Sequence, residues 1–69
     1  MNHIERKQYP ALNEILWDIS TETISEQTAF HLYEKRWRFI DQNKLTDQEK
    51  QLIQILTDKF GSGLFLPAS

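Results

Sequence analysis

The stretch Tyr33-Glu34-Lys35-Arg36-Trp37-Arg38-Phe39 decides the fold of this chain, because it must serve the interior and the surface of one helix at once. It packs three cations and three aromatic side chains into seven residues. At about 100° per residue, the side chains that share one side of this helix are Ala29, Phe30, Tyr33, Trp37 and Ile40. Leu32 and Phe39 widen the apolar arc to about half of the circumference, and a helix that apolar is usually covered by two neighbours.

The central helix is predicted to run from about residue 24 to residue 41. A polar connection, Ser20-Thr21-Glu22-Thr23, precedes it. Thr23 or Ser25 can cap its start by accepting a backbone N–H bond. Thr23 also has Glu26 three residues on, which is a capping box.

An earlier helix is predicted over residues 10–19. Tyr9-Pro10 marks its start, because proline is tolerated in a first helical turn, where its missing N–H costs nothing. The residues at i, i+3, i+4 and i+7, the spacing of one helical face, are Leu12, Ile15, Leu16 and Ile19. Residues 1–8 are polar, and we expect them to be disordered.

A third helix is predicted over residues 46–60. Thr46-Asp47-Gln48-Glu49 is a capping box with acids in the first turn, where the helix dipole favours them. Its apolar face consists of Leu52, Ile53, Ile55, Leu56 and Phe60. Gly61 ends it, since glycine takes the left-handed conformation that follows many helices. The predicted fold is all-α: one domain over residues 9–69, a small three-helix bundle with a short apolar C-terminal tail, and no extended sheet.

The length and composition exclude several classes of protein. A chain of 69 residues buries only ~60% of the surface that its unfolded form exposes, so small domains usually need a disulfide, a metal ion or a partner. The absence of cysteine excludes disulfides and thiolate metal sites. No stretch approaches the ~20 apolar residues of a membrane span, and residues 1–8 lack the apolar run of a secretory signal. We therefore expect a cytoplasmic protein that does not bind membranes.

The sequence contains no recognisable catalytic or cofactor motif. It lacks a glycine-rich phosphate loop and a nucleophile elbow. His3 and His31 are not in a metal-ligand spacing, and the paired carboxylates Asp47 and Glu49 are explained by the capping box. We expect no enzyme, no cofactor and no metal site.

Three features depart from the helical pattern and are candidates for partner binding. Arg36 falls inside the apolar arc, where it pairs with Glu14 or Asp18, packs its stem while its head reaches solvent, or anchors a partner. Trp17 lies off the face of its helix and is either covered by Tyr9 or the tail, or used for binding. The tail Leu64-Phe65-Leu66 either folds back onto the helices or docks on a partner.

A basic strip on the central helix is the remaining candidate. His31, Lys35 and Arg38 fall within about 60° of one another, although Glu34 partly neutralises Arg38 at i, i+4. The strip is either a solvated helix face or a surface for phosphates or an acidic partner. Together with Arg36, it supports an alternative function as a nucleic-acid-binding regulator. The net charge of -2 lacks the basic excess of such modules.

Residues 45–56 resemble the opening helix of LuxR-type helix-turn-helix domains, whose capping box and apolar face they share. In such domains a turn and a recognition helix follow, whereas here Gly61-Ser62-Gly63 and the apolar tail follow. We therefore do not expect the element that reads DNA in that family to follow this helix.

The function that the sequence favours is a small non-enzymatic protein–protein interaction module. It would be a homo-oligomer, a regulatory subunit or an antitoxin-like inhibitor. A homodimer is slightly favoured, because marginal domains gain stability from association. Nucleic acid is not favoured as a partner.

Overall fold

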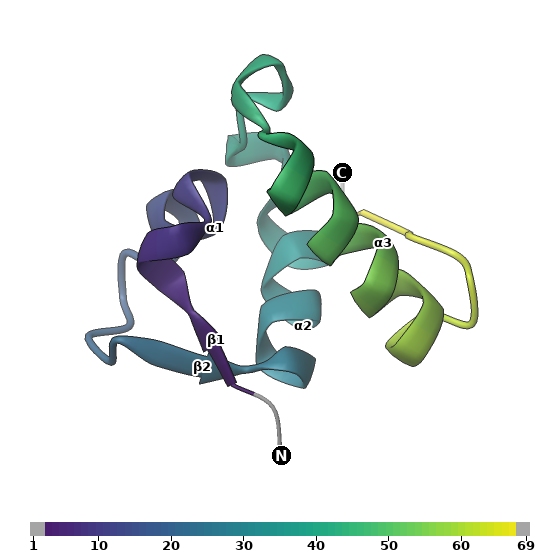
Figure 1. Cartoon of the computed structure of the whole chain (residues 1–69), viewed down its shortest axis with the longest axis horizontal. Helices are drawn as coiled ribbons and strands as arrows, with labels where there is room; N and C mark the ends of the chain where they lie inside the picture. Colours follow the sequence, from purple (N-terminus) through teal and green to yellow (C-terminus); the bar gives the residue numbers. More distant parts are fainter. Residues whose placement is uncertain (1–2, 68–69) are drawn as a thin grey trace.

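The computed structural model describes residues 3–67, which are mainly helical with one small antiparallel sheet. The α-helices are α1 (Pro10–Ile15), α2 (Glu26–Arg36) and α3 (Asp47–Phe60), and the strands are β1 (His3–Glu5) and β2 (Thr23–Ser25). The short 3-10 helices are η1 (Arg6–Gln8), η2 (Trp37–Phe39) and η3 (Gln42–Lys44). Helix α2 is central and contacts both α1 and α3, which lie on opposite sides of it, while the sheet lies beside its first turn (Figure 1). The structure is mainly helical, as predicted, but it also contains a two-stranded sheet that was not predicted.

The sheet joins the start of the chain to the residues before α2. Ile4 pairs with Ile24 in antiparallel register, and both side chains are buried. The segment 3–8, expected to be disordered, instead forms β1 and η1. Burial of Ile4 explains the difference, since it supplies apolar contact to a segment that otherwise looks polar. Residues 1–2 of that expected segment and residues 68–69 of the expected domain lie outside the described residues.

Helix α1 ends four residues earlier than predicted. The expected face is buried at Leu12, Ile15 and Leu16, but Leu16 already leaves the helical conformation. Two arginines donate hydrogen bonds to backbone carbonyl groups that a longer helix would use for its own backbone hydrogen bonds. The guanidinium of Arg6 donates to the carbonyl of Leu16, and that of Arg36 donates to the carbonyl of Ile15.

Helix α2 starts and ends inside its predicted range. Ser25, not Thr23, caps it by accepting the backbone N–H of Thr28, because residue 23 belongs to β2. After Arg36 the chain tightens into η2, so the side chains no longer follow the 100° spacing. Phe39, predicted to lie on the apolar arc, is therefore exposed, whereas Ile40 is buried as predicted.

Helix α3 matches its prediction within one residue. Thr46 caps it by accepting the backbone N–H of Glu49. The Glu49 side chain, however, does not return to Thr46. It is fully buried and accepts the backbone N–H groups of Ala11 and Leu12 at the start of α1. Glu49, which the sequence assigned to a local capping box, thus connects α3 to α1.

Gly61 follows α3 but does not adopt the left-handed conformation predicted for it, since its φ is -106°. Positive φ angles occur instead at Ser62 and Gly63. Gly61 is needed for space: a Cβ atom there would lie 2.8 Å from the Phe30 ring and 2.3 Å from the carbonyl oxygen of Leu64. This close approach lets the tail turn back beside α3 (Figure 1), where Phe65 packs against Phe30 of α2.

Candidate functional site

Two large aromatic side chains meet on the surface beside α1. Trp17 follows α1 and is 58% exposed, and Phe39 ends η2 and is 53% exposed. Their rings pack edge to face with centroids 5.4 Å apart. Isolated apolar residues on a surface need no explanation, but two in contact make a patch that can be covered by another molecule.

Arg36 packs against the Trp17 ring of this aromatic pair. Its guanidinium carbon lies 4.4 Å from the centroid of the Trp17 ring. The same group donates to both carboxylate oxygens of Asp18, at 2.9 and 2.8 Å, and to the carbonyl of Ile15. The predicted ion pair of Arg36 is confirmed with Asp18. Of the two roles considered for Arg36, the intramolecular one is therefore present, and the guanidinium fixes the position of Trp17.

The electrostatics of this pair follow from its geometry. The two-pronged hydrogen bond from Arg36 holds the pKa of the Asp18 carboxyl at about 2, and partial desolvation opposes that shift. The same hydrogen bond raises the pKa of Arg36. Both groups are charged at neutral pH, so the pair adds no net charge to the surface.

Arg38 packs against Phe39, the other ring of the aromatic pair. Its guanidinium carbon lies 4.8 Å from the centroid of the Phe39 ring. The expected neutralisation by Glu34 is absent, because the α-helical spacing between the two residues is interrupted after Arg36. The Glu34 carboxylate instead accepts the backbone N–H of Leu66. Among residues 3–67 the ion pairs are Arg36–Asp18 and Lys59–Glu26, so Arg38 has no carboxylate partner there.

We call Trp17, Arg36, Arg38 and Phe39 the aromatic patch. Lys35 lies close enough for its charge to help lower the pKa of Asp18, so it borders this patch. His31 lies on the exposed surface of α2, one turn before Lys35.

The predicted tail residues divide into two groups. The Phe65 ring packs edge to face against Trp37, with centroids 4.9 Å apart, and against Phe30 at 6.2 Å. Leu64 and Leu66 are 63% and 69% exposed. The tail thus folds back through Phe65 and does not cover Trp17, whose aromatic neighbour is Phe39.

Phe39 is a residue of the candidate site that the sequence analysis missed. The helical spacing assigned it to the core. Phe39 directly follows Arg38 in a segment with three cations, and this position could have indicated that its side chain lies at the surface. Glu49 and Arg6 were also missed. They bind backbone groups of α1 and its following loop, together with the side chains of Tyr33 and Asn13, and these contacts explain the fold.

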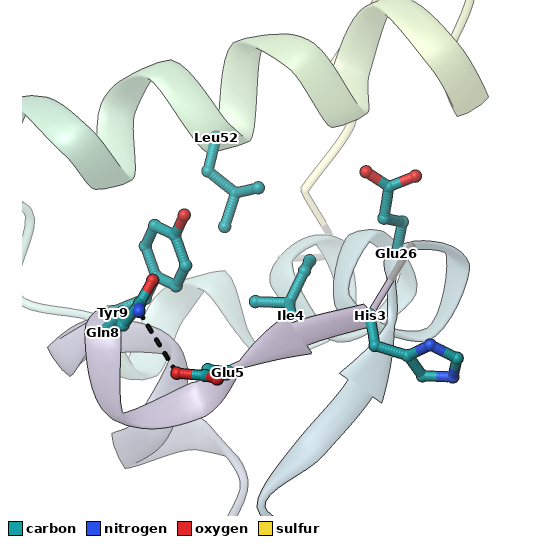
Figure 2. Close-up of a pocket in the computed structure, with 7 residues that line it drawn as sticks. All are labelled: His3, Ile4, Glu5, Gln8, Tyr9, Glu26 and Leu52. Atoms are coloured by element: carbon teal, nitrogen blue, oxygen red, sulfur yellow. Dashed lines mark hydrogen bonds between the residues drawn. The ribbon is translucent and has the colours of Figure 1, made fainter. Parts of the chain in front are cut away.

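A second surface feature is a depression of about 470 Å³ between β1 and α3. Figure 2 shows Leu52 and Ile4 pointing toward each other across it, with Tyr9 beside them and the ring of His3 directed away. Glu26 at its edge is ion-paired with Lys59. Within residues 3–67, no group of three or more His, Cys, Asp or Glu side chains is placed to hold a metal ion.

Comparisons with known proteins give no relative from which to assign a role. No protein-family profile matches the chain, and no significant match was found among curated proteins or solved structures. None of the helices described between residues 3 and 67 is long and apolar enough to cross a membrane.

Proposed function

We propose that this protein is a small non-enzymatic protein-binding module and that the aromatic patch is its contact surface. The observation that carries the proposal is the exposure of Trp17 and Phe39, which are held in contact with each other while more than half of each side chain faces solvent. Tryptophan and arginine are the residues most enriched among those that dominate binding energy at interfaces.

The patch is pre-organised for binding. Arg36 packs against Trp17 and is anchored by Asp18 and by the backbone of α1. A partner therefore does not need to order the Trp17 side chain when it binds, and less conformational entropy is lost. The module would act in the cytoplasm as a regulatory subunit or an antitoxin-like inhibitor, on a helical scaffold of the bundle type.

The test is a comparison of partners captured in the native cells. Tagged wild-type protein, the double variant Trp17→Ala/Phe39→Ala and the control Ile55→Ala are cross-linked and their partners identified by mass spectrometry. Ile55 is a suitable control because it is 48% exposed on α3. We expect a partner that is captured by wild type and control and lost from the double variant, with similar thermal melting of all three. Identical partners for all three proteins would contradict the proposal.

Self-association is a second candidate, and the exposure of Leu64 and Leu66 favours it. A symmetric dimer would cover these side chains against their copies. Light scattering at micromolar concentration should then give twice the monomer mass, and Leu64→Ser/Leu66→Ser should return the chain to a monomer. A wild-type monomer would remove this candidate.

Nucleic-acid binding through His31, Lys35, Arg36 and Arg38 has less support. Arg36 is already neutralised by Asp18, and the chain carries a net charge of -2. Nucleic-acid modules derive most of their affinity from neutralising phosphates.

A further inference from the structure

We propose that the aromatic patch binds an acidic segment of a partner protein, in which a carboxylate pairs with Arg38 while an apolar side chain packs against Trp17 and Phe39. This inference rests on the proposed function and adds the chemistry of the partner. It follows from a difference between the two arginines of the patch. Among residues 3–67, Arg36 forms an ion pair with a carboxylate and Arg38 does not.

The two guanidinium groups differ in their hydrogen-bond partners within the chain. That of Arg36 is committed to Asp18 and to the carbonyl of Ile15. That of Arg38 is exposed, and Glu34, the acid that could have neutralised it, holds the backbone of Leu66 instead. In the part of the chain from residue 3 to residue 67, no carboxylate lies within ion-pair distance of Arg38.

The Arg38 guanidinium is also positioned by the patch itself. It lies over the ring of Phe39 at 4.8 Å, an arrangement in which a planar cation is attracted by the aromatic face. A guanidinium stacked in this way still presents its N–H donors at its edge, in the fork geometry that fits a carboxylate. A partner carboxylate at this edge would lie next to the exposed aromatic surface.

Lys35 is exposed on α2 next to Arg36 in the chain, and it adds a second unpaired cation among residues 3–67 at the border of the patch. Complementary charge around an apolar contact raises the rate of encounter and disfavours partners of the wrong sign. The patch therefore selects an acidic segment over a basic one, although the whole chain is weakly acidic.

A single-stranded nucleic acid is the rival ligand, because exposed aromatic rings and arginines also bind bases and phosphates. The packing of the rings argues against it. Arginine covers one face of Trp17 and one face of Phe39, and the two rings meet edge to face. Bases stack on open ring faces, and these contacts reduce the open face that both rings offer.

The experiment uses three defined probes and the full chain. The probes are a blocked peptide of alternating glutamate and phenylalanine, its counterpart with lysine for glutamate, and a ten-nucleotide thymidine strand. Binding is followed by NMR at the two indole N–H signals, which are assigned with Trp17→Phe, and affinities come from calorimetry. The charge variant is Arg38→Gln, and its matched control is Lys50→Gln, an exposed cation on α3.

We expect the acidic peptide to shift the Trp17 signal and the basic peptide to leave it unchanged. Arg38→Gln should weaken the acidic peptide about tenfold, the effect of losing one hydrogen-bonded charge pair, whereas Lys50→Gln should leave the affinity within about twofold. Equal binding of both peptides, no shift with the acidic one, equal effects of Arg38→Gln and Lys50→Gln, or tighter binding of the thymidine strand would each overturn the inference.

Failure of the inference can be told apart from failure of the proposed function. If cross-linking in cells still finds a partner that depends on Trp17 and Phe39, but the peptides do not discriminate by charge, the patch binds a protein of different chemistry. If no captured partner depends on these two residues, the proposed function itself is wrong.

Discussion

The hydroxyl of Tyr33 donates a hydrogen bond of 2.7 Å to the carboxylate of Glu49, and both side chains are fully buried between α2 and α3. The same carboxylate accepts the backbone N–H groups of Ala11 and Leu12. Three donors thus satisfy a charge that would be costly to bury alone. Burial, together with the hydrogen bond to Glu49, raises the pKa of Tyr33. One acid therefore joins all three α-helices.

Removing either partner of this hydrogen bond should destabilise the fold. Tyr33→Phe should lower the free energy of unfolding by about 1–3 kcal/mol, because the carboxylate loses one donor in a buried site. Glu49→Ala should cost more, about 3–5 kcal/mol, since it leaves three buried donors unpaired and opens a cavity. Urea unfolding followed by circular dichroism measures both. Tyr9→Phe is the matched control, and an effect as large as that of Tyr33→Phe would contradict this account.

The Asp18–Arg36 pair should contribute stability that depends on pH. The pKa of Asp18 is about 2 in the folded chain, against an ordinary value of 3.8. Between these values the unfolded state binds more protons, so stability is fully present above pH ~4 and is lost as the pH falls toward 2. The melting temperatures of wild type and Asp18→Asn should therefore differ at pH 6 and converge near pH 2. A constant difference across this range would show that the charge of Asp18 is not the cause.

Arg36→Ala should destabilise the chain by about 1–3 kcal/mol, because the carbonyl of Ile15 loses its donor and the Trp17 ring loses its support. Arg36→Lys tests the geometry, since an ammonium group cannot bond both oxygens of Asp18 and also stack on an aromatic ring in the same way. We expect it to recover only part of the loss in thermal melting. An unchanged melting temperature for Arg36→Ala would show that Arg36 does not contribute to the stability of the fold.

The two glycines after α3 should respond differently to alanine. Gly61→Ala places a methyl group against the carbonyl of Leu64 and the ring of Phe30, so it should displace the tail and lower the melting temperature clearly. Gly63→Ala meets no atom within 4 Å, but its φ is +83°, so it should cost only about 1–2 kcal/mol of backbone strain. If Gly63→Ala proves the more damaging, close packing is not the reason for Gly61.

The helices were predictable from the sequence where their signals are local. Helix α3 has a capping threonine, a long apolar face and a terminating glycine, and its predicted bounds hold within one residue. The strands have no such signal, because each is three residues long with one buried isoleucine, Ile4 or Ile24. A period of two cannot be recognised in so short a segment.

The residues that were missed depend on contacts between distant parts of the chain. Glu49 has a sufficient local explanation in its capping box, but its side chain binds Tyr33, 16 positions earlier, and two backbone groups that lie 37 and 38 positions earlier. Phe39 was placed in the core because the helix was extended through η2. Trp17 and Arg36 were identified because each departs from the pattern of its own helix, which can be seen without knowing the partner.

Helix α1 is only six residues long, and an isolated helix of that length does not persist in water. Its first turn is held by Glu49 and its last carbonyls by Arg6 and Arg36. Trp17 follows directly, so its orientation exists only in chains whose three helices have already assembled. Partner binding at this residue, as proposed, would therefore be thermodynamically linked to folding. A ligand that contacts Trp17 would raise the unfolding free energy of the whole domain in proportion to the logarithm of its concentration once it exceeds the dissociation constant.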